Sequence, residues 1–233
     1  MKIMDVFYPR RCAVCDRAIP DREYPVCFTC RKQLHRITGN RCMRCSKPLD
    51  HEEKEYCMDC RKHSHAYECG FAAFLYRGEM QESLMRFKYG GRQEYGYFYA
   101  KVLAEAAGTF LEKACPDVLL PVPIHRLKFL KRGYNQAEIL ADQLSKLWKL
   151  PVNTTCLKRI RHTKAQKNLS PRERRKNLRA AFQICEAVTW KSVMLVDDIY
   201  TTGSTIDAIA ELLKEAGVER VYFVTVCIGM GES

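Results

Sequence analysis

Eight of the thirteen cysteines form two copies of one spacing, C-x2-C-x11-C-x2-C, and this repeat constrains the fold more than any other feature. Each position of the first copy recurs 30 residues later in the second. Four thiolates in two such pairs are the ligands of a closed, tetrahedral, structural zinc site. We therefore predict two Zn²⁺ sites, with interleaved pairing of the cysteines and an iron–sulfur cluster as alternatives. The predicted ligands are Cys12, Cys15, Cys27 and Cys30 for one ion, and Cys42, Cys45, Cys57 and Cys60 for the other.

The N-terminal residues contain no apolar stretch as long as that of a signal peptide. The longest apolar runs, near 118–124 and 221–228, are too short to span a bilayer. We therefore expect a cytoplasmic protein that does not insert into a membrane, in which clustered cysteines bind metal rather than form disulfides. A module of this size with so little core is expected to need metal to fold.

After residue 65 the pattern changes to alternating strands and helices. Short apolar runs predict strands at 71–76, 117–123, 193–196 and 221–227. Apolar residues at helical spacing predict helices at 79–89, 95–114, 135–150 and 204–216. Such alternation is typical of an α/β domain whose parallel sheet is covered on both faces. We expect two units, a double zinc ribbon in 1–65 and the α/β domain in 66–233.

The strand predicted at 193–196 is followed by two carboxylates and a loop of small polar residues. In open α/β sheets, ligands bind at the carboxyl ends of strands. Asp197 and Asp198 can accept hydrogen bonds from the two hydroxyls of a ribose. A 5′-phosphate can bind to the hydroxyls and backbone N–H groups that follow, at the start of the next helix. These predicted phosphate-binding residues are Thr201, Thr202, Gly203, Ser204 and Thr205.

A strand ending in Asp-Asp also occurs as the magnesium-binding element of P-loop NTPases. That element requires a partner of the form G-x-x-x-x-G-K-[ST], and the sequence contains none. We therefore favour a ribose-phosphate site over a P-loop site and over an ordinary acidic loop.

The positive charge of the chain is concentrated in one segment. The formal net charge is +12, and residues 122–182 contain sixteen Lys or Arg against three Asp or Glu. Such a field attracts polyanions, either a diphosphate or a nucleic acid. Residues 158–179 alone contain ten basic residues, more than one small ligand requires, so part of this charge is expected to follow a nucleic-acid backbone. A solvated helix face is the alternative.

Several motifs together resemble the ComF family of competence proteins. The loop at 197–205 is similar to the phosphoribosyl diphosphate signature of type I phosphoribosyltransferases, and the cysteine repeat precedes it. The other motifs that carry the resemblance are Phe87-Lys88-Tyr89-Gly90, Val122-Pro123-Ile124-His125, Arg132-Gly133-Tyr134-Asn135-Gln136-Ala137, and Thr163-x-x-Gln166-x-x-Leu169. The resemblance implies a type I phosphoribosyltransferase-like domain with a parallel sheet, preceded by a small double zinc ribbon with four cysteines at each metal site.

The resemblance also implies roles for residues and partners. Asp197 and Asp198 would be catalytic, and the ligands would be Mg²⁺ and phosphoribosyl diphosphate. The implied diphosphate-binding residues are Val122, Pro123, Ile124, His125 and Arg126. Residues 159–177 correspond to a mobile loop that closes over the ligand. The residues implied for this loop and for nucleic acid are Arg132, Arg159, Arg161, Lys164, Gln166, Lys167, Arg172, Arg174 and Arg175.

The resemblance further implies a role in the uptake of single-stranded DNA in natural transformation, with single-stranded DNA and a helicase-like competence partner as the macromolecules involved. Two hypotheses remain. The domain is a phosphoribosyltransferase with an unidentified acceptor, or it is an inactive module that binds nucleic acid or docks a partner. The fold alone does not decide between them.

Overall fold

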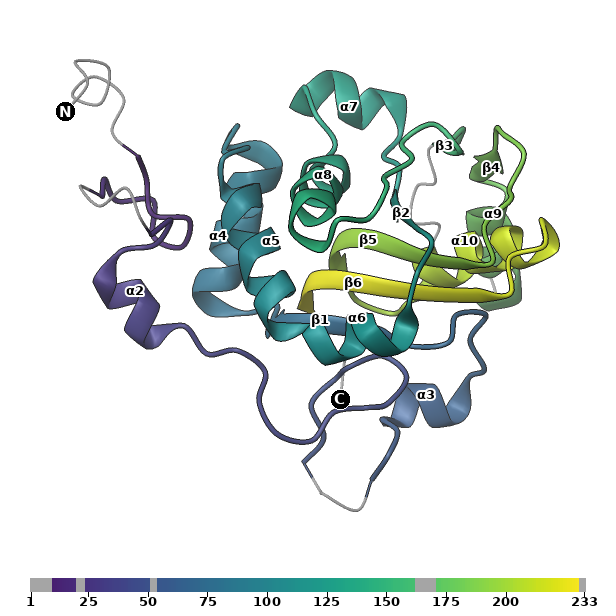
Figure 1. The fold of residues 1–233 in the computed structure, drawn as a ribbon, viewed down its shortest axis with the longest axis horizontal. Coiled ribbons are helices and arrows are strands. Elements are labelled where there is room, and N and C mark those ends of the chain that lie inside the picture. The colour runs from purple at the N-terminus through teal and green to yellow at the C-terminus, as the bar shows by residue number, and fades with distance from the viewer. Residues whose placement is uncertain (1–9, 20–23, 51–53, 162–170, 231–233) are drawn as a thin grey trace.

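The computed structural model describes residues 10–19, 24–50, 54–161 and 171–230 (Figure 1). At its centre lies a four-stranded parallel sheet with the strand order β1-β6-β5-β2. The strands are β1 (Gly70–Leu75), β2 (Val118–Pro121), β5 (Ser192–Tyr200) and β6 (Arg220–Ile228). The α/β class with a parallel sheet, predicted from the sequence, is confirmed.

Helices cover both faces of this sheet. Successive side chains of a strand point to opposite faces, so Met194 and Val196 enter one hydrophobic cluster while Val193 and Leu195 enter another. On the first face lie α4 (Gly78–Tyr89), α5 (Tyr95–Ala106) and α8 (Gln136–Trp148), and on the second lies α10 (Ser204–Glu215) (Figure 1). Among the described residues, no helix is both long enough and apolar enough to cross a bilayer.

Two elements differ from the sequence prediction. The helix expected over 95–114 is divided into α5 and α6 (Gly108–Ala114), because Ala107 leaves the helical range with φ −99° and ψ 11°. Gly108 follows this break, and glycine inside a helix costs about 1 kcal/mol relative to alanine. The strand expected over 193–196 continues as β5 to Tyr200, because β6 supplies pairing partners as far as Ile228.

Short elements that the sequence did not predict lie around the basic segment. A two-stranded antiparallel ribbon joins β3 (Leu157–Arg159) to β4 (Phe182–Ile184). The chain between these strands includes α9 (Pro171–Arg179), and residues 162–170 lie outside the described part. A further helix, α7 (Arg126–Arg132), directly follows the loop after β2. The ribbon therefore anchors both ends of the segment that the sequence assigned to a mobile loop.

The 30-residue repeat of the cysteines is also a repeat of backbone structure. In the first copy the amide of Asp16 donates to the carbonyl of Cys12, and in the second Ser46 donates to Cys42, both at 2.9 Å. Asp16 and Ser46 share the left-handed conformation, with φ of 61° and 68°. A short helix begins after the third cysteine of each copy, α2 (Phe28–Gln33) in the first and α3 (Met58–Lys62) in the second.

The two zinc ribbons lie on opposite faces of the sheet. Val14 and Val26 of the first ribbon pack in the cluster that contains Phe87 of α4. Cys42 and Cys45 of the second ribbon instead belong to the cluster that contains residues of α10. In Figure 1 the first ribbon, with α2, is on the left beside α4, and the second, with α3, is at the bottom.

The segment between the ribbons runs along β1, which is the edge strand of the sheet. Arg36 forms an antiparallel bridge with Phe74, and the Ile37 amide donates to the Ala73 carbonyl at 2.9 Å. This contact covers backbone groups that would otherwise offer an open edge. The boundary between 1–65 and 66–233 stays a prediction, and apolar contacts cross it on both faces of the sheet.

Candidate functional site

The two carboxylates of β5 lie near its carboxyl end, in a site bounded by α4. Asp197 pairs in register with Thr225 of β6, and its Oδ1 accepts a hydrogen bond from the Asp198 amide at 2.8 Å. Asp198 is only 6% exposed, and its Oδ2 lies 2.7 Å from Nζ of Lys88, in the last turn of α4. The site therefore holds one carboxylate bound by an ammonium group and a second carboxylate directly beside it in sequence.

The electrostatic environment of these carboxylates is unusual. Burial, and then the charge of Asp198, hold the pKa of Asp197 well above its usual range. Burial lowers the pKa of Lys88, but the attraction of Asp198 and Asp197 more than offsets this, so its pKa is raised overall. A carboxyl with a raised pKa in such a site is typical of functional residues.

Arg159 of β3 interacts with Asp197, and Lys128 and Arg132 of α7 lie close to Arg159 and Lys88. Burial lowers the pKa of Arg159 in β3, and Asp197 is the charge that acts in the opposite direction. The side chain of Lys128 on α7 reaches the surface, yet its pKa is lowered by desolvation and then by the charges of Arg159 and Arg132. With Lys88 these residues form a cluster of four cations, of which Lys88 and Arg159 interact with the carboxylates, and such a cluster favours a bound polyanion.

Hydroxyl groups collect at the start of α10. Thr201, Thr202 and Ser204 are exposed, and the hydroxyls of Thr202 and Ser204 lie 2.8 Å apart. Gly203 turns the chain into the helix with φ of 77°. A twelve-residue helix begins at this point with its positive dipole end, and its first N–H group, that of Ser204, donates to Thr202 Oγ1 at 3.4 Å. The predicted phosphate-binding segment, including Thr205 in the first turn, therefore has the backbone that anion binding requires.

The predicted diphosphate-binding loop lies beside the same strand end. The Val122 amide donates to the Val196 carbonyl of β5 at 2.9 Å, and Asn135 Nδ2 donates to the Val122 carbonyl at 3.1 Å. Val122 and Pro123 are buried, Ile124 and His125 are half-buried, and Arg126 is exposed. The His125 ring caps α7 by accepting from the Leu127 amide at 3.3 Å. His125 thus has a structural role.

The predicted mobile-loop residues are brought together only in part. Arg132 on α7 donates to Gln136 Oε1 at 2.8 Å and to the Tyr89 hydroxyl at 2.9 Å, and its guanidinium lies 4.7 Å from the Tyr89 ring centre. Arg161 is exposed beyond β3. Lys164, Gln166 and Lys167 fall outside the described residues. Arg172, Arg174 and Arg175 lie on α9, and only their backbone is described.

Sequence reasoning assigned no site role to Lys88, whereas it placed Lys128 in a basic cluster with Arg126, Lys131 and Arg132 beside the predicted diphosphate loop. Lys88 lies in the motif Phe87-Lys88-Tyr89-Gly90, and this motif was a signal that could have identified it. Lys128 lies in the basic run of α7. Tyr134, although it follows the basic residues of α7, is not placed to stack on a base, because it is 7% exposed and donates to the Phe87 carbonyl.

The eight cysteines of the repeat form two sets of four in the sequential pairing. Within each set all Sγ atoms lie within 4.8 Å of one another. Cys15 and Cys27 Sγ are 3.9 Å apart, and Cys45 and Cys57 Sγ are 3.6 Å apart. A zinc tetrahedron with the usual Zn–S length has sulfur edges of about 3.8 Å. The residues present therefore fit one Zn²⁺ in each set.

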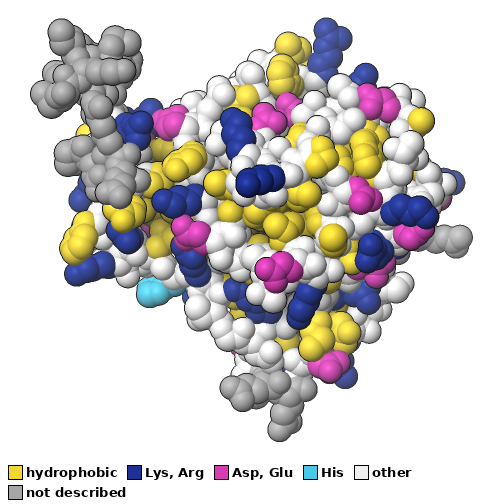
Figure 2. All heavy atoms as spheres, viewed as in Figure 1, with side chains coloured by type: hydrophobic (Ala, Val, Ile, Leu, Met, Phe, Trp, Pro, Cys, Tyr) yellow, Lys and Arg dark blue, Asp and Glu magenta, His cyan; other side chains and the backbone are white. Residues whose placement is uncertain are grey.

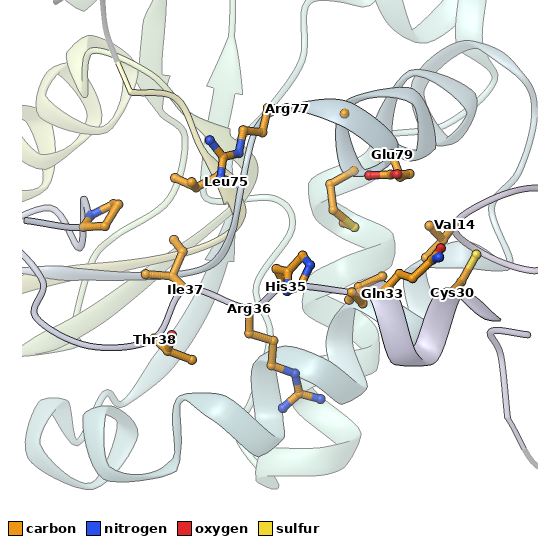
Figure 3. Close-up of a pocket in the computed structure, with 14 residues that line it drawn as sticks. Val14, Cys30, Gln33, His35, Arg36, Ile37, Thr38, Leu75, Arg77 and Glu79 are labelled. Atoms are coloured by element: carbon orange, nitrogen blue, oxygen red, sulfur yellow. The ribbon is translucent and has the colours of Figure 1, made fainter. Parts of the chain in front are cut away.

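A cavity of about 400 Å³ lies away from the two carboxylates and the phosphate-binding segment, beside Cys30 of the first cysteine set (Figure 3). It is bounded by the first ribbon, the segment between the ribbons, and the start of α4. His35, Arg36 and Thr38 contribute from the segment between the ribbons, and Arg77 and Glu79 from the opposite side. None of the residues predicted for the ribose-phosphate site lines it.

Two known protein families match separate parts of the chain. The double zinc ribbon domain family matches residues 3–61, and the phosphoribosyl transferase domain family matches residues 110–232. A purine phosphoribosyltransferase from Pyrococcus horikoshii is 16% identical, with a TM-score of 0.33, over 57% of this chain and 84% of that chain. That structural likeness is too distant to support an inference.

Three curated proteins are similar to this chain. Competence protein F of Haemophilus influenzae is 40% identical over 46% of this chain and 48% of that protein. DNA utilization protein YhgH of Escherichia coli K12 is 35% identical over 48% and 49% of the two chains. Competence protein ComFC of Streptococcus pneumoniae is 30% identical over 64% of each. The chain spans about half the length of the first two relatives.

Proposed function

Because this chain belongs to the phosphoribosyl transferase domain family and, with its double zinc ribbon, to the ComF-type proteins, we propose that it binds phosphoribosyl diphosphate and acts on DNA taken up by the cell. The observation that carries the proposal is that two carboxylates, with Lys88 and Arg159 interacting with them, lie at the strand end that leads into a hydroxyl-rich helix start. These three kinds of group match the three parts of the ligand.

Each part of the ligand has its own set of residues. The ribose hydroxyls donate to Asp197 and Asp198. The 5′-phosphate accepts from the amides and hydroxyls of 201–205. The diphosphate lies between the loop at 122–126 and the cations of α4, α7 and β3. Lys88 therefore connects the ribose and diphosphate regions, since it already contacts Asp198 at 2.7 Å.

Magnesium belongs to the same proposal. Mg²⁺ prefers oxygen ligands and is usually held by one or two carboxylates together with substrate phosphates. Asp197 and Asp198 are the carboxylates available, so the site fits Mg²⁺ that arrives with the diphosphate. Bound there, the ion supplies positive charge to the leaving diphosphate.

In the transferase version of the proposal, diphosphate leaves ribose C1 and a nucleophile bonds to that carbon. The residues of this chain position the ligand and stabilise the charge that develops on it. In the alternative version the same residues only hold the ligand, or the 5′-phosphate end of DNA. A screen of nucleobases and DNA as acceptors separates the two versions.

The proposed macromolecular ligand is single-stranded DNA, in the cytoplasm. Helix α7 supports this, because Leu127, Phe129 and Leu130 are 61%, 44% and 67% exposed between lysines and arginines. Over α7, at the top of Figure 2, dark-blue basic side chains lie beside yellow hydrophobic ones. Exposed aromatic and basic groups together are typical of surfaces that bind single strands. A helicase-like partner stays a prediction for which the described residues show no specific contact.

Calorimetric titration of phosphoribosyl diphosphate with Mg²⁺ into the zinc-loaded protein tests the central proposal. We expect micromolar binding that is lost in the Asp197→Asn/Asp198→Asn variant. Asp142→Asn is the matched control, because Asp142 is an exposed carboxylate on α8. Absence of binding by folded wild-type protein would contradict the proposal and favour a module that binds only nucleic acid.

A further inference from the structure

The second zinc ribbon contacts the start of α10 through one histidine. His65 Nε2 lies 3.6 Å from Sγ of the predicted zinc ligand Cys60. His65 Nδ1 lies 2.6 Å from Oδ2 of Asp207 in the first turn of α10, where a carboxylate can only accept the hydrogen bond. The His65 and Asp207 side chains are only 6% and 11% exposed. The buried side chain of His65 therefore connects the predicted zinc ligand Cys60 to α10, the helix that begins within the phosphate-binding residues 201–205.

Asp207 fixes the beginning of α10 at two more points. Its Oδ1 accepts a hydrogen bond from the Ala66 amide at 2.9 Å. Its own amide donates to the carbonyl of Gly203 at 2.8 Å. The carboxylate thus holds the helix start against the chain that leaves the second ribbon, while the same residue's backbone is bonded to the turn at Gly203.

A second path from His65 reaches the phosphate loop through two tyrosines. The His65 ring stacks on Tyr67 with centroids 4.8 Å apart, and the Tyr67 and Tyr200 hydroxyls are 2.7 Å apart. Tyr200 stacks on Phe223 at 4.8 Å and lies directly against Gly203. Both tyrosines are almost fully buried. These buried rings therefore connect His65 to the turn at Gly203.

The first ribbon makes different contacts in the described part of the chain, and the repeat makes the comparison direct. His35 occupies the position in the first copy that His65 occupies in the second, five residues after the last cysteine. His35 is exposed and lines the cavity in Figure 3. The first ribbon instead contacts α5 and the connection before it, where Asp16 binds Arg92 at 3.0 Å and accepts a hydrogen bond from the Tyr95 hydroxyl of α5.

We propose that His65, Asp207 and the Tyr67–Tyr200 pair are positioning residues that couple zinc in the second ribbon to the phosphate-binding turn at 201–205. With the second ribbon metal-loaded, His65 is held in place, and α10 and Gly203 keep the arrangement that receives the 5′-phosphate. Binding coupling of this kind is reciprocal, so a ligand at the turn raises the affinity of the second ribbon for zinc and leaves that of the first unchanged. The ligand half of this inference rests on the proposed function, whereas the structural half does not.

The structural half is tested without any ligand. His65→Phe keeps a ring on Tyr67 but removes both nitrogens, and His35→Phe makes the same change at the equivalent position of the first ribbon. With two zinc ions bound per chain, we expect hydrogen exchange at the amides of 201–207 to be roughly tenfold faster in His65→Phe, the factor for losing one hydrogen bond to a charged group. His35→Phe should match the wild type. Equal exchange in both variants would overturn the proposal.

A second variant tests the same contact independently, in case His65→Phe does not fold. Asp207→Asn keeps an oxygen for the Ala66 amide and removes the charge that holds His65. We expect faster exchange in 201–207 here as well, with zinc content unchanged. Unchanged exchange in a zinc-loaded Asp207→Asn protein also counts against the coupling.

The reciprocal half is tested by equilibrium competition for zinc with a colorimetric chelator in excess Mg²⁺. In the wild type and in His35→Phe, phosphoribosyl diphosphate should raise the chelator concentration needed to remove one of the two zinc ions. In His65→Phe this protection should be lost. If the wild type does not bind phosphoribosyl diphosphate at all, the proposed function fails while the exchange experiment still decides the coupling. Binding without protection of either zinc would overturn the coupling alone.

Discussion

At the scale of single residues, Gly203 occupies a turn that leaves no room for a side chain. Its φ of +77° disfavours any residue with a Cβ, and a Cβ there would overlap the hydroxyl of Tyr200. We expect Gly203→Ala to lower the free energy of unfolding by about 2–4 kcal/mol, combining the left-handed penalty with overpacking. Chemical denaturation measures this change.

The matched control is Gly39→Ala. Gly39 has almost the same φ, +76°, but nothing lies within 4 Å of the Cβ position. Gly39→Ala should therefore lower the free energy of unfolding only by the penalty of the left-handed conformation, about 1–2 kcal/mol. Equal losses at Gly39 and Gly203 would mean that Tyr200 does not support the turn.

Asp197 is expected to make the protein without ligand less stable at neutral pH. Its pKa in the folded chain is raised by burial and by Asp198, so the folded state disfavours the charged form relative to the unfolded state. The free energy of unfolding of the wild type should therefore rise as the pH falls from above the raised pKa of Asp197 in the folded chain towards the ordinary pKa of an aspartate in the unfolded chain. Asp197→Asn should be more stable than wild type by about 1–3 kcal/mol at about pH 8, and this advantage should shrink as the pH falls and Asp197 of the wild type becomes protonated.

Denaturation at several pH values, with zinc content followed, tests this sign. Asp142→Asn, an exposed carboxylate change, should show no advantage at any pH. If the difference in free energy of unfolding between Asp197→Asn and the wild type does not vary with pH, the raised pKa of Asp197 is contradicted. The same variant should lose phosphoribosyl diphosphate binding, so stability and function change in opposite directions.

Part of the site could be predicted from neighbouring residues and part could not. Asp197, Asp198 and 201–205 are close together in sequence, and the chemistry of a strand followed by hydroxyls and glycine identifies them. Lys88 reaches Asp198 only because α4 ends at the carboxyl edge of β5. Such a contact depends on the packing of distant elements, which a single sequence does not specify.

At the scale of elements, α7 is a short helix with no buried residue. It carries exposed Leu127, Phe129 and Leu130 among basic residues, next to the proposed diphosphate loop. We expect Phe129→Ala/Lys131→Gln to weaken binding of single-stranded DNA about tenfold, since stacking contributes about 1–3 kcal/mol per base. The slope of affinity against salt should fall by about 0.7 for the lost phosphate contact.

Fluorescence anisotropy with a labelled oligothymidine measures both quantities. Phe110→Ala/Lys113→Gln on α6 is the control, because it makes the same chemical changes on another helix. Phosphoribosyl diphosphate affinity should be unchanged in the α7 variant, which keeps Lys128 and Arg132. Identical DNA binding in the α7 and α6 variants would exclude α7 as the DNA surface.

Sequence periodicity identified the long elements and missed the short ones. The strands β1, β2, β5 and β6 and the helices α4, α8 and α10 carry strong apolar patterns, and each was predicted near its observed position. The three-residue strands β3 and β4 are too short to show a pattern, and α7 has no buried face to generate one. The break between α5 and α6 depends on one backbone conformation at Ala107.

At the scale of the whole molecule, the sequence predicted two zinc sites but not their placement. Pairing within each set of four cysteines follows from short loop closure. The position of the ribbons on opposite faces depends on Ile37 and Arg36 lying along β1, which no local pattern indicates. The ribbons therefore share both hydrophobic clusters with the sheet, and they should not unfold as independent units.

This sharing predicts that removing zinc destabilises the entire chain. The two tryptophans report on the two faces, because Trp148 packs against the cluster of the first ribbon and Trp190 against that of the second. In Trp148→Phe and Trp190→Phe proteins, the remaining tryptophan should show the same unfolding midpoint. Chelation should lower both midpoints by roughly 10 °C or more, since about 1 kcal/mol shifts Tm by about 2–4 °C in a chain of this size. Zinc added back in excess should restore them. If chelation instead removes the zinc and leaves both tryptophan unfolding midpoints unchanged, the sheet folds without zinc-loaded ribbons. The contacts of the ribbons with the two faces would then contribute little to the stability of the sheet.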